Sequence, residues 1–216
     1  MQATTSTTAK LDAGASGAAR ARLLDGFGAA VAERGYAATT IAGIVRHAQV
    51  SKRTFYEHFA DKEECFLASY EAAAENKLEL VRGALEAEGP WLARLESALL
   101  AYIEARAARP ELSRTHLLEI QAAGPRALKL RRDVIQRFAN VLRRFAEGVS
   151  REDPKLHALS PAMALAIVGG INELLLLGAE TGSPKRVPEL AETARLLVHG
   201  AMAAPRARAG KSRAKR

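Results

Sequence analysis

Short breaks made of glycine, proline and helix-capping residues divide most of this chain into segments with helical periodicity. In the first segment apolar residues such as Leu23, Phe27 and Val31 recur at intervals of three and four, and Gly35 ends the run. No segment alternates apolar and polar residues over β-branched positions, as strands do. The sequence therefore predicts an all-α fold of about nine helices. After the first helix they are expected near 41–47, 52–58, 61–82, 90–109, 110–123, 125–150, 160–179 and 187–202.

Residues 39–62 have the pattern of two short helices joined by a tight turn. On the second helix Phe55 and Phe59 lie four residues apart and share one face, which leaves Arg53 on the opposite face. The two phenylalanines can dock the helix while its polar face looks outward. This arrangement is typical of a helix-turn-helix whose second helix enters the major groove of DNA.

The polar residues of this segment differ in what they can bind on DNA. Arg53 suits bidentate pairing with guanine, which is worth about 1–3 kcal/mol of discrimination. Side chains that suit phosphates fix the register of a protein without reading sequence; these are Lys52, Tyr56, His58 and Lys62, with Thr40 and Ser51 at the two helix starts. By spacing alone, the segment is as compatible with a solvated surface as with DNA binding.

Residues 17–70 resemble the N-terminal domain of tetracycline-repressor-type (TetR family) regulators. The family spacing is carried by Gly35-Tyr36, Thr39-Thr40, Ile41-Ala42, Val50-Ser51, Thr54-Phe55-Tyr56, His58-Phe59 and Lys62-Glu63. One departure is Gln49, where the family usually has glycine, so Gln49 must adopt a left-handed conformation at some cost or belong to a different turn. A second is Glu57 on the outward face, which either points aside or accepts from a cytosine.

The resemblance implies a transcriptional regulator with a defined set of DNA contacts. By resemblance, the residues at DNA-touching positions are Thr40, Ser51, Lys52, Arg53, Thr54, Tyr56, His58 and Lys62. Arg53 and Thr54 are expected at bases and the others mainly at the backbone. Repression is the usual outcome in the family and is the expectation here, with activation as the alternative.

Beyond residue 70 the resemblance is architectural. Family members dimerise through their last two long helices, which here implies a homodimer and a palindromic operator with half-sites one turn, about 34–36 Å, or a multiple apart. The segment 162–179 is apolar nearly all round and needs cover on several sides. The residues expected at the dimer interface are Ile167, Gly170, Leu174, Leu190, Ala194, Leu197 and Val198.

Helices four to seven enclose a small-molecule pocket in the family. Candidates for effector contact here are Trp91, Leu95, Tyr102, His116, Glu119, Phe138, Leu142, Met163 and Asn172, each of them more typical of ordinary core or surface than of a ligand contact. Asn172 and Glu173 form a polar pair within an apolar helix and need partners across the dimer, on neighbouring helices or in an effector. A mostly apolar cavity indicates a drug-like cation, a fatty acid or an acyl derivative, and Glu119 with Glu173 would favour a cation.

The expected organisation has four parts. Residues 1–15 are small and polar and are expected to form a disordered arm. Residues 16–62 form the helix-turn-helix domain, 63–203 the helical effector-binding and dimerisation domain, and 204–216 a flexible basic tail. The tail holds six of the basic residues, so without it the net charge falls from +8 to +2. It is either a sequence-independent DNA contact or a solubilising end.

Several other functions find no support in the sequence. The five histidines and the single cysteine, Cys65, have no metal-ligand spacing, so we expect no metal and no cofactor. Cys65 follows two acidic residues, which should raise its thiol pKa and make it a poor nucleophile. We therefore expect no enzyme. No secretory signal is evident, which favours the cytoplasm. The remaining alternative is a helical DNA-binding or scaffold protein without a small-molecule effector.

Overall fold

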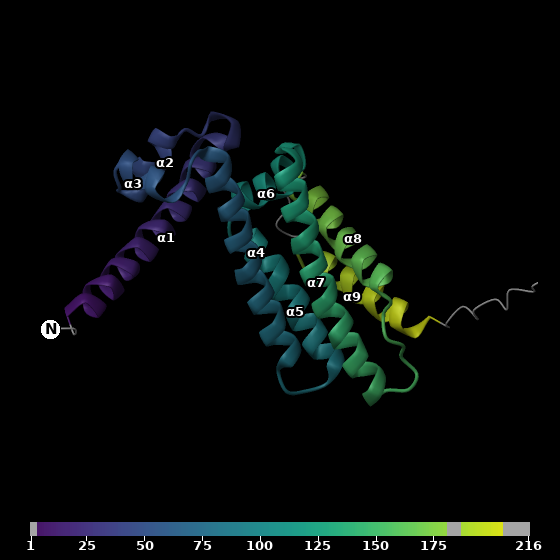
Figure 1. Ribbon diagram of the computed structural model, residues 1–216. Helices are drawn as coiled ribbons and strands as arrows, with labels where there is room; N and C mark the ends of the chain where they lie inside the picture. The colour runs from purple at the N-terminus through teal and green to yellow at the C-terminus, as the bar shows by residue number, and fades with distance from the viewer. Residues whose placement is uncertain (1–3, 181–186, 205–216) are drawn as a thin grey trace, which may run out of the picture.

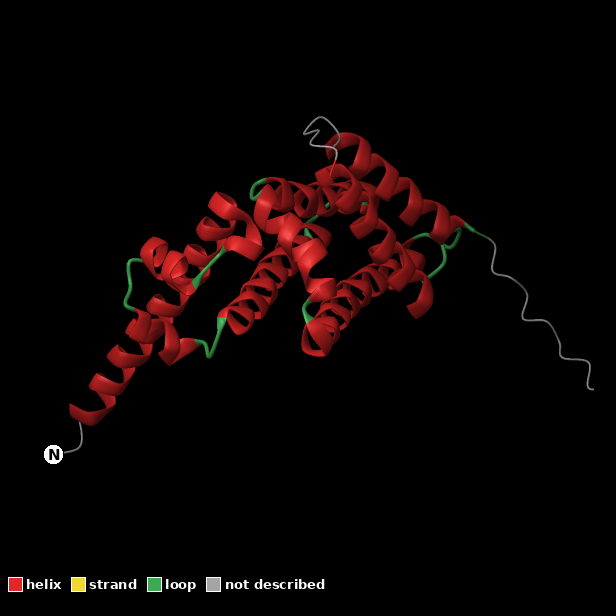
Figure 2. Ribbon diagram, turned by 90° about the horizontal axis from the view of Figure 1, so that it is seen from above, coloured by secondary structure: helices red, strands yellow, loops and turns green. Residues whose placement is uncertain are grey.

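The computed structural model describes residues 4–180 and 187–204, and every regular element within them is an α-helix (Figure 2). The helices are α1 (Thr4–Ala38), α2 (Ile41–Ala48), α3 (Lys52–His58), α4 (Lys62–Glu86), α5 (Trp91–Ala107), α6 (Pro110–Ala122), α7 (Gly124–Glu152), α8 (Pro161–Glu180) and α9 (Val187–Ala203). The predicted all-α class is thereby confirmed for the described residues. From α2 onward the helix ends lie close to expectation, except that α4 continues past Gly83 to Glu86. Glycine, proline and capping residues mark most of these ends.

The N-terminal arm differs from the expectation of disorder. α1 begins at Thr4, so residues 4–15 are helical, and Figure 1 shows this end of α1 extending away from the rest of the molecule. Proline, the strongest helix breaker, is absent from this stretch, although threonine and serine of modest helix propensity outnumber alanine in it. The helix is interrupted at Gly35, whose φ of 74° only glycine adopts easily. The expected loop at 182–184 and the basic tail at 205–216 lie outside the described residues.

The first three helices form a small unit with its own core. Leu23, Phe27, Ile44 and Phe55 are all fully buried within it. α1 and α2 approach closely at Gly26, where an added Cβ would lie 2.7 Å from the Ile44 carbonyl oxygen. This packing holds α2 against α1 and presents α3 on the outside of the unit (Figure 1).

The remaining helices form a bundle. α4 packs against α5 and α7, α5 also packs against α9, and α7 against α8. α6 contacts both α1 and α7 and so connects the first unit with the bundle. α8 is long and apolar enough to cross a membrane by length and composition alone, which is weak evidence for such a role. α8 and α9 lie on the side of the bundle away from α4 (Figure 1).

Candidate DNA-binding and effector sites

Side-chain caps fix where α2 and α3 begin. Thr40 Oγ1 accepts a hydrogen bond from the Gly43 N–H at 3.1 Å, and Ser51 Oγ accepts from the Thr54 N–H at 3.0 Å. Each cap satisfies one of the N–H groups that a first helical turn leaves free. Between the helices Gln49 adopts φ 53° and ψ 45°, so it takes the left-handed conformation that glycine usually supplies at this turn.

The candidate recognition helix α3 has one apolar and one polar face. Phe55 is fully buried and Phe59 is 3% exposed, and both belong to the core of the first unit. On the other side the Arg53 side chain is 90% exposed and Tyr56 is 57% exposed. Lys52 is exposed as well. The structure therefore gives α3 an accessible polar surface of the kind that can enter a groove.

Within this surface Arg53 is held by an acidic neighbour. Its Nε donates to Glu57 Oε1 at 3.1 Å, one turn further along α3. Ser51 Oγ lies 2.9 Å from Thr54 Oγ1, so these two hydroxyls are also paired. Glu57 thus points along the outward face toward Arg53, and a guanine that pairs with Arg53 would compete with this exposed ion pair.

Two of the expected phosphate contacts are less available than Arg53. Lys62 is half-buried; its Nζ donates to the Tyr36 carbonyl at 3.1 Å and lies 4.5 Å from the centre of the Tyr36 ring. His58 is half-buried beside Phe59. Thr40 is exposed at the start of α2, where its hydroxyl already caps the helix. Lys62 therefore has a structural role that the sequence did not reveal.

An ion cluster joins α1 to α2 beside the helix-turn-helix, and sequence patterns did not indicate it. Glu33 accepts from Arg46 at 2.6 Å and lies 2.8 Å from His47 Nε2, and Arg34 lies 3.2 Å away. The hydrogen bond with His47 and the two arginines lower the pKa of the exposed Glu33 carboxyl. Arg46 and His47 follow Glu33 by 13 and 14 residues, so no helical spacing links them to it.

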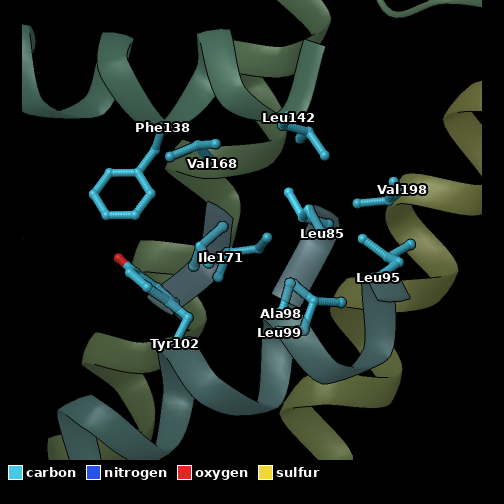
Figure 3. A pocket seen from close by; sticks show the side chains of 11 residues that line it. Leu85, Leu95, Ala98, Leu99, Tyr102, Phe138, Leu142, Val168, Ile171 and Val198 are labelled. Atoms are coloured by element: carbon cyan, nitrogen blue, oxygen red, sulfur yellow. The ribbon is translucent and has the colours of Figure 1, made fainter. Parts of the chain in front are cut away.

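An apolar cavity of about 60 Å³ lies inside the bundle (Figure 3). Its lining comes from α4, α5, α7, α8 and α9 and consists of Val81, Leu85, Leu95, Ala98, Leu99, Tyr102, Phe138, Leu142, Val168, Ile171 and Val198. Of the expected effector contacts, four lie on it: Leu95, Tyr102, Phe138 and Leu142. The lining residues that the sequence did not indicate lie one helical turn from these four or on helices that face them. Ordinary core residues recur with the same helical spacing, so spacing does not distinguish cavity-lining residues from core.

The other expected effector residues do not line this cavity. Trp91 stacks on His199 at a ring separation of 5.7 Å, and Met163 is 45% exposed on α8. Glu119 lies near enough to Tyr36 to help raise the pKa of that phenol, after burial and Glu63. His116 and Asn172 line a small crevice of about 10 Å³.

Asn172 finds its partner inside the chain. Its Oδ1 accepts a hydrogen bond from the Tyr102 hydroxyl at 2.8 Å, and Arg106 Nη2 donates to the same hydroxyl at 2.9 Å. Glu173 is exposed and lines the small crevice. The two polar residues of α8 therefore have different environments. Asn172 accepts a hydrogen bond from Tyr102 on α5, whereas Glu173 faces solvent.

The residues expected at a dimer interface are also divided. Ile167, Ala194 and Val198 are buried within the single chain and pack in its core. Gly170, Leu174 and Leu190 are half-buried, and Leu197 is 42% exposed. Among the described residues, most of the large apolar side chains that remain exposed lie on α8 and α9: Met163, Leu165, Leu177, Leu196 and Leu197.

Cys65 is fully buried, and burial is the largest of the effects that raise the pKa of its thiol to about 12. Glu64 contributes in the same direction and Arg20 opposes it. A thiol in this environment is a poor nucleophile, although burial rather than acidic neighbours is the main cause. Among the described residues, no group of three or more histidine, cysteine or acidic side chains is placed to hold a metal ion.

The chain thus has an N-terminal helix-turn-helix unit of the DNA-binding type followed by a helical bundle with an internal cavity. Residues 28–69 match the family model of bacterial regulatory proteins, tetR family. This match covers the end of α1, all of α2 and α3 and the start of α4, and so includes the residues that cap α2 and α3. The N-terminal unit of this chain is therefore similar to the DNA-binding domain of tetR-family regulators.

Solved structures share this fold over most of their length. The fatty acid degradation regulator FadR from Bacillus halodurans superposes with a TM-score of 0.72 at 18% identity, over 83% of this chain and 97% of that chain. FadR from Bacillus subtilis in complex with stearoyl-CoA gives 0.72 at 16% identity, over 83% and 97%. A tetR-family regulator from Mesorhizobium loti gives 0.70 at 19% identity, over 86% and 95%. No curated protein matches this chain significantly.

Proposed function

We propose that this protein is a homodimeric repressor that binds a palindromic operator through α3 and leaves it when a small, mostly apolar effector occupies the bundle cavity. The observation that carries the proposal is the two-faced recognition helix, with Phe55 fully buried and Arg53 90% exposed. Arg53 and Thr54 meet bases, while Ser51, Lys52 and Tyr56 hold the backbone.

Dimerisation through α8 and α9 has support in the exposed surface. Met163, Leu165, Leu196 and Leu197 are each more than 40% exposed. Exposed apolar side chains gathered on neighbouring helices are typical of protein interfaces. A two-fold axis between paired α8 and α9 helices places two recognition helices on one face of a duplex, which accounts for a palindromic site. The same surface accounts for the apolar character of α8 without a membrane.

Release by an effector follows from the size and place of the cavity. A drug-sized ligand needs about 300–1,000 Å³, whereas the cavity measures about 60 Å³, so a ligand must widen it. Val81 and Leu85 line the cavity from α4, and the same helix begins at Lys62, which holds the Tyr36 carbonyl of the DNA-binding unit. Widening shifts α4 and with it the α3 helix of each subunit. A ligand that binds this shifted conformation more tightly than the DNA-binding conformation lowers the fraction of protein bound to DNA. The stearoyl-CoA complex of the similar Bacillus subtilis regulator supports an acyl-type effector.

Selection of bound fragments from random DNA, at one stated salt concentration, tests the DNA-binding proposal. We expect a palindromic consensus with half-sites about 34–36 Å or a multiple apart, preferred over random DNA by about 10³-fold or more. Arg53→Ala should relax one position in each half-site at a cost of about 1–3 kcal/mol. Arg82→Ala, which removes an exposed arginine on α4, is the matched control. A set of fragments without a consensus, or an Arg53→Ala protein with unchanged selectivity, would refute the proposal.

A further inference from the structure

The apolar cavity ends at a polar wall formed around Tyr102. The Tyr102 ring lines the cavity and meets Phe138 edge to face at a ring separation of 5.3 Å. Figure 3 shows these two rings together at one end, with the Tyr102 hydroxyl directed away from Leu142, Leu95 and Val198 at the other. That hydroxyl is bonded to Asn172 and Arg106. The cavity therefore has an aliphatic end and an end that adjoins hydrogen-bonding groups.

Arg106 at this wall carries a charge without a matching anion. It forms no ion pair with any described residue, and its Nε is buried without a hydrogen-bond partner. Its guanidinium lies 5.0 Å from the centre of the Tyr102 ring. Arg106 is half-buried as a residue. Arginine cannot relieve such a site by losing its proton, and a charge that is partly removed from water gains from an anionic partner. The side chain is thus set to accept an anionic partner.

Arg106 acts electrostatically on two further side chains, a lysine and a histidine. Lys77 on α4 donates only to the Ala73 carbonyl at 2.8 Å, and burial, followed by Arg106 and Arg109, lowers the pKa of its ammonium to about 7. His116 on α6 is buried, which with Lys77 and Arg106 lowers the pKa of its imidazole to about 3, so it is neutral at pH 7.

The acidic side chains of this region are engaged elsewhere or face solvent. Glu71 and Glu75 pair with Arg137 on α7. Glu173 is exposed at the outer crevice, and Glu119 lies near enough to Tyr36 to help raise the pKa of that phenol. The local balance of charge at the cavity's polar end is therefore positive, which disfavours the cationic ligand expected from the acidic residues in the sequence.

We propose that the effector is a single-chain amphiphile with a compact anionic head, whose carboxylate or phosphate binds Arg106 and Lys77 at the Tyr102 end of the cavity. This proposal rests on the proposed function and assigns its ligand class. The chain occupies the aliphatic end, between Leu95 and Leu142. The head lies directly at the chain terminus, because Arg106 is bonded to the hydroxyl of Tyr102, whose ring lines the cavity. It supplies the acceptor that Arg106 Nε lacks, and a planar guanidinium can bind a carboxylate with two parallel hydrogen bonds.

Calorimetric titration of the full chain with ten-carbon probes of matched length, all below their micellar concentrations, tests this assignment. Decanoate and decyl phosphate should bind at least tenfold more tightly than decanol or decyltrimethylammonium, since hydrogen bonds to charged groups are worth about one order of magnitude in affinity. The ratio of decanoate to decyl phosphate distinguishes the two heads. Equal binding of decanol, tighter binding of the cation, binding of decanoyl-coenzyme A alone, or binding of no probe would each overturn the proposal.

Two variants of α5 locate the head. Arg106→Gln should remove the preference for decanoate over decanol while decanol binding stays the same. Arg94→Gln is the matched control, because Arg94 also has a buried Nε without a partner but pairs with Glu152 in another part of the bundle. Loss of the preference in Arg94→Gln but not in Arg106→Gln would refute the assignment. Operator selection uses no amphiphile, so failure of the ligand class and failure of DNA binding remain distinguishable.

Discussion

Lys62, the first residue of α4, donates a hydrogen bond to the Tyr36 carbonyl at 3.1 Å and lies over the Tyr36 ring at 4.5 Å. Tyr36 closes the α1 end of the DNA-binding unit, and its ring contacts Phe66 one turn further along α4 at a ring separation of 4.9 Å. The first turns of α4 are thus tied to the DNA-binding unit by a polar bond and by aromatic packing at one point.

Lys62→Met should weaken this connection. Loss of the cation–π contact and of the charged hydrogen bond should lower the free energy of unfolding by about 1–2 kcal/mol. Urea denaturation measures it. Lys52→Met, which removes an exposed lysine at the start of α3, should leave stability unchanged and reduce only DNA affinity. Equal free energies of unfolding in the two variants would show that the contact between Lys62 and Tyr36 does not stabilise the fold.

Gly26→Ala should destabilise the DNA-binding unit. A Cβ at this position would lie 2.7 Å from the Ile44 carbonyl oxygen and 2.8 Å from Ala48 Cβ and N, so α1 and α2 must move apart. Overpacking of this kind costs about 1–3 kcal/mol. Gly17→Ala, also in α1 but with nothing within 4 Å, should instead stabilise the helix by about 0.5–1 kcal/mol. Thermal unfolding followed by circular dichroism compares them, and similar shifts in both variants would contradict the role of Gly26.

The helices of this fold could be predicted because their signals are local. Thr40, Ser51 and Asp61 cap the helices that they precede, as their side-chain oxygens and positions predict. Gln49 could be identified as a strained position because it stands where glycine is expected, and the structure gives it a φ of 53°. The expected disordered arm differs because a small, polar stretch without proline is compatible with both helix and disorder.

The candidate sites depend on distances between helices, which periodicity does not contain. Whether Ile167 faces its own chain or a partner is decided by the rotation of α8 against α7 and α9, and the structure buries it within the chain. The contact between Tyr102 and Asn172 joins residues 70 positions apart. Arg106 was missed because a single arginine near a helix end is typical of a solvated surface.

A double substitution on α9 should separate the subunits. Leu196 and Leu197 are 55% and 42% exposed, and glutamate at both positions would place charge in the proposed interface. Light scattering at micromolar concentration should give twice the chain mass of 23.2 kDa for the wild-type protein and one chain mass for the variant. Leu80→Glu, on an equally exposed leucine of α4, should remain dimeric. A monomeric wild-type protein, or a dimeric double variant, would reject this interface.

Lys77 should make stability rise with pH above neutrality. Its pKa is about 7 in the folded chain, where Arg106, Arg109 and His116 surround it, against 10.5 ordinarily. Between these values the unfolded chain binds more protons than the folded chain, so the free energy of unfolding increases with pH. From pH 7 to 8.5 the free energy of unfolding should increase by an amount on the order of 1 kcal/mol. This range lies below 9.0, the ordinary pKa of a cysteine thiol, so Cys65 contributes little to the change.

Urea denaturation at several pH values measures this gain, and Lys77→Met should abolish it by removing the titrating group. Lys129→Met is the control, because Lys129 is exposed on α7 and pairs with Asp133 at 2.6 Å. That variant should retain the wild-type rise. If Lys77→Met kept the full rise, the ammonium would have to be solvated in the folded chain, and Lys77 could not serve as a buried cation beside Arg106.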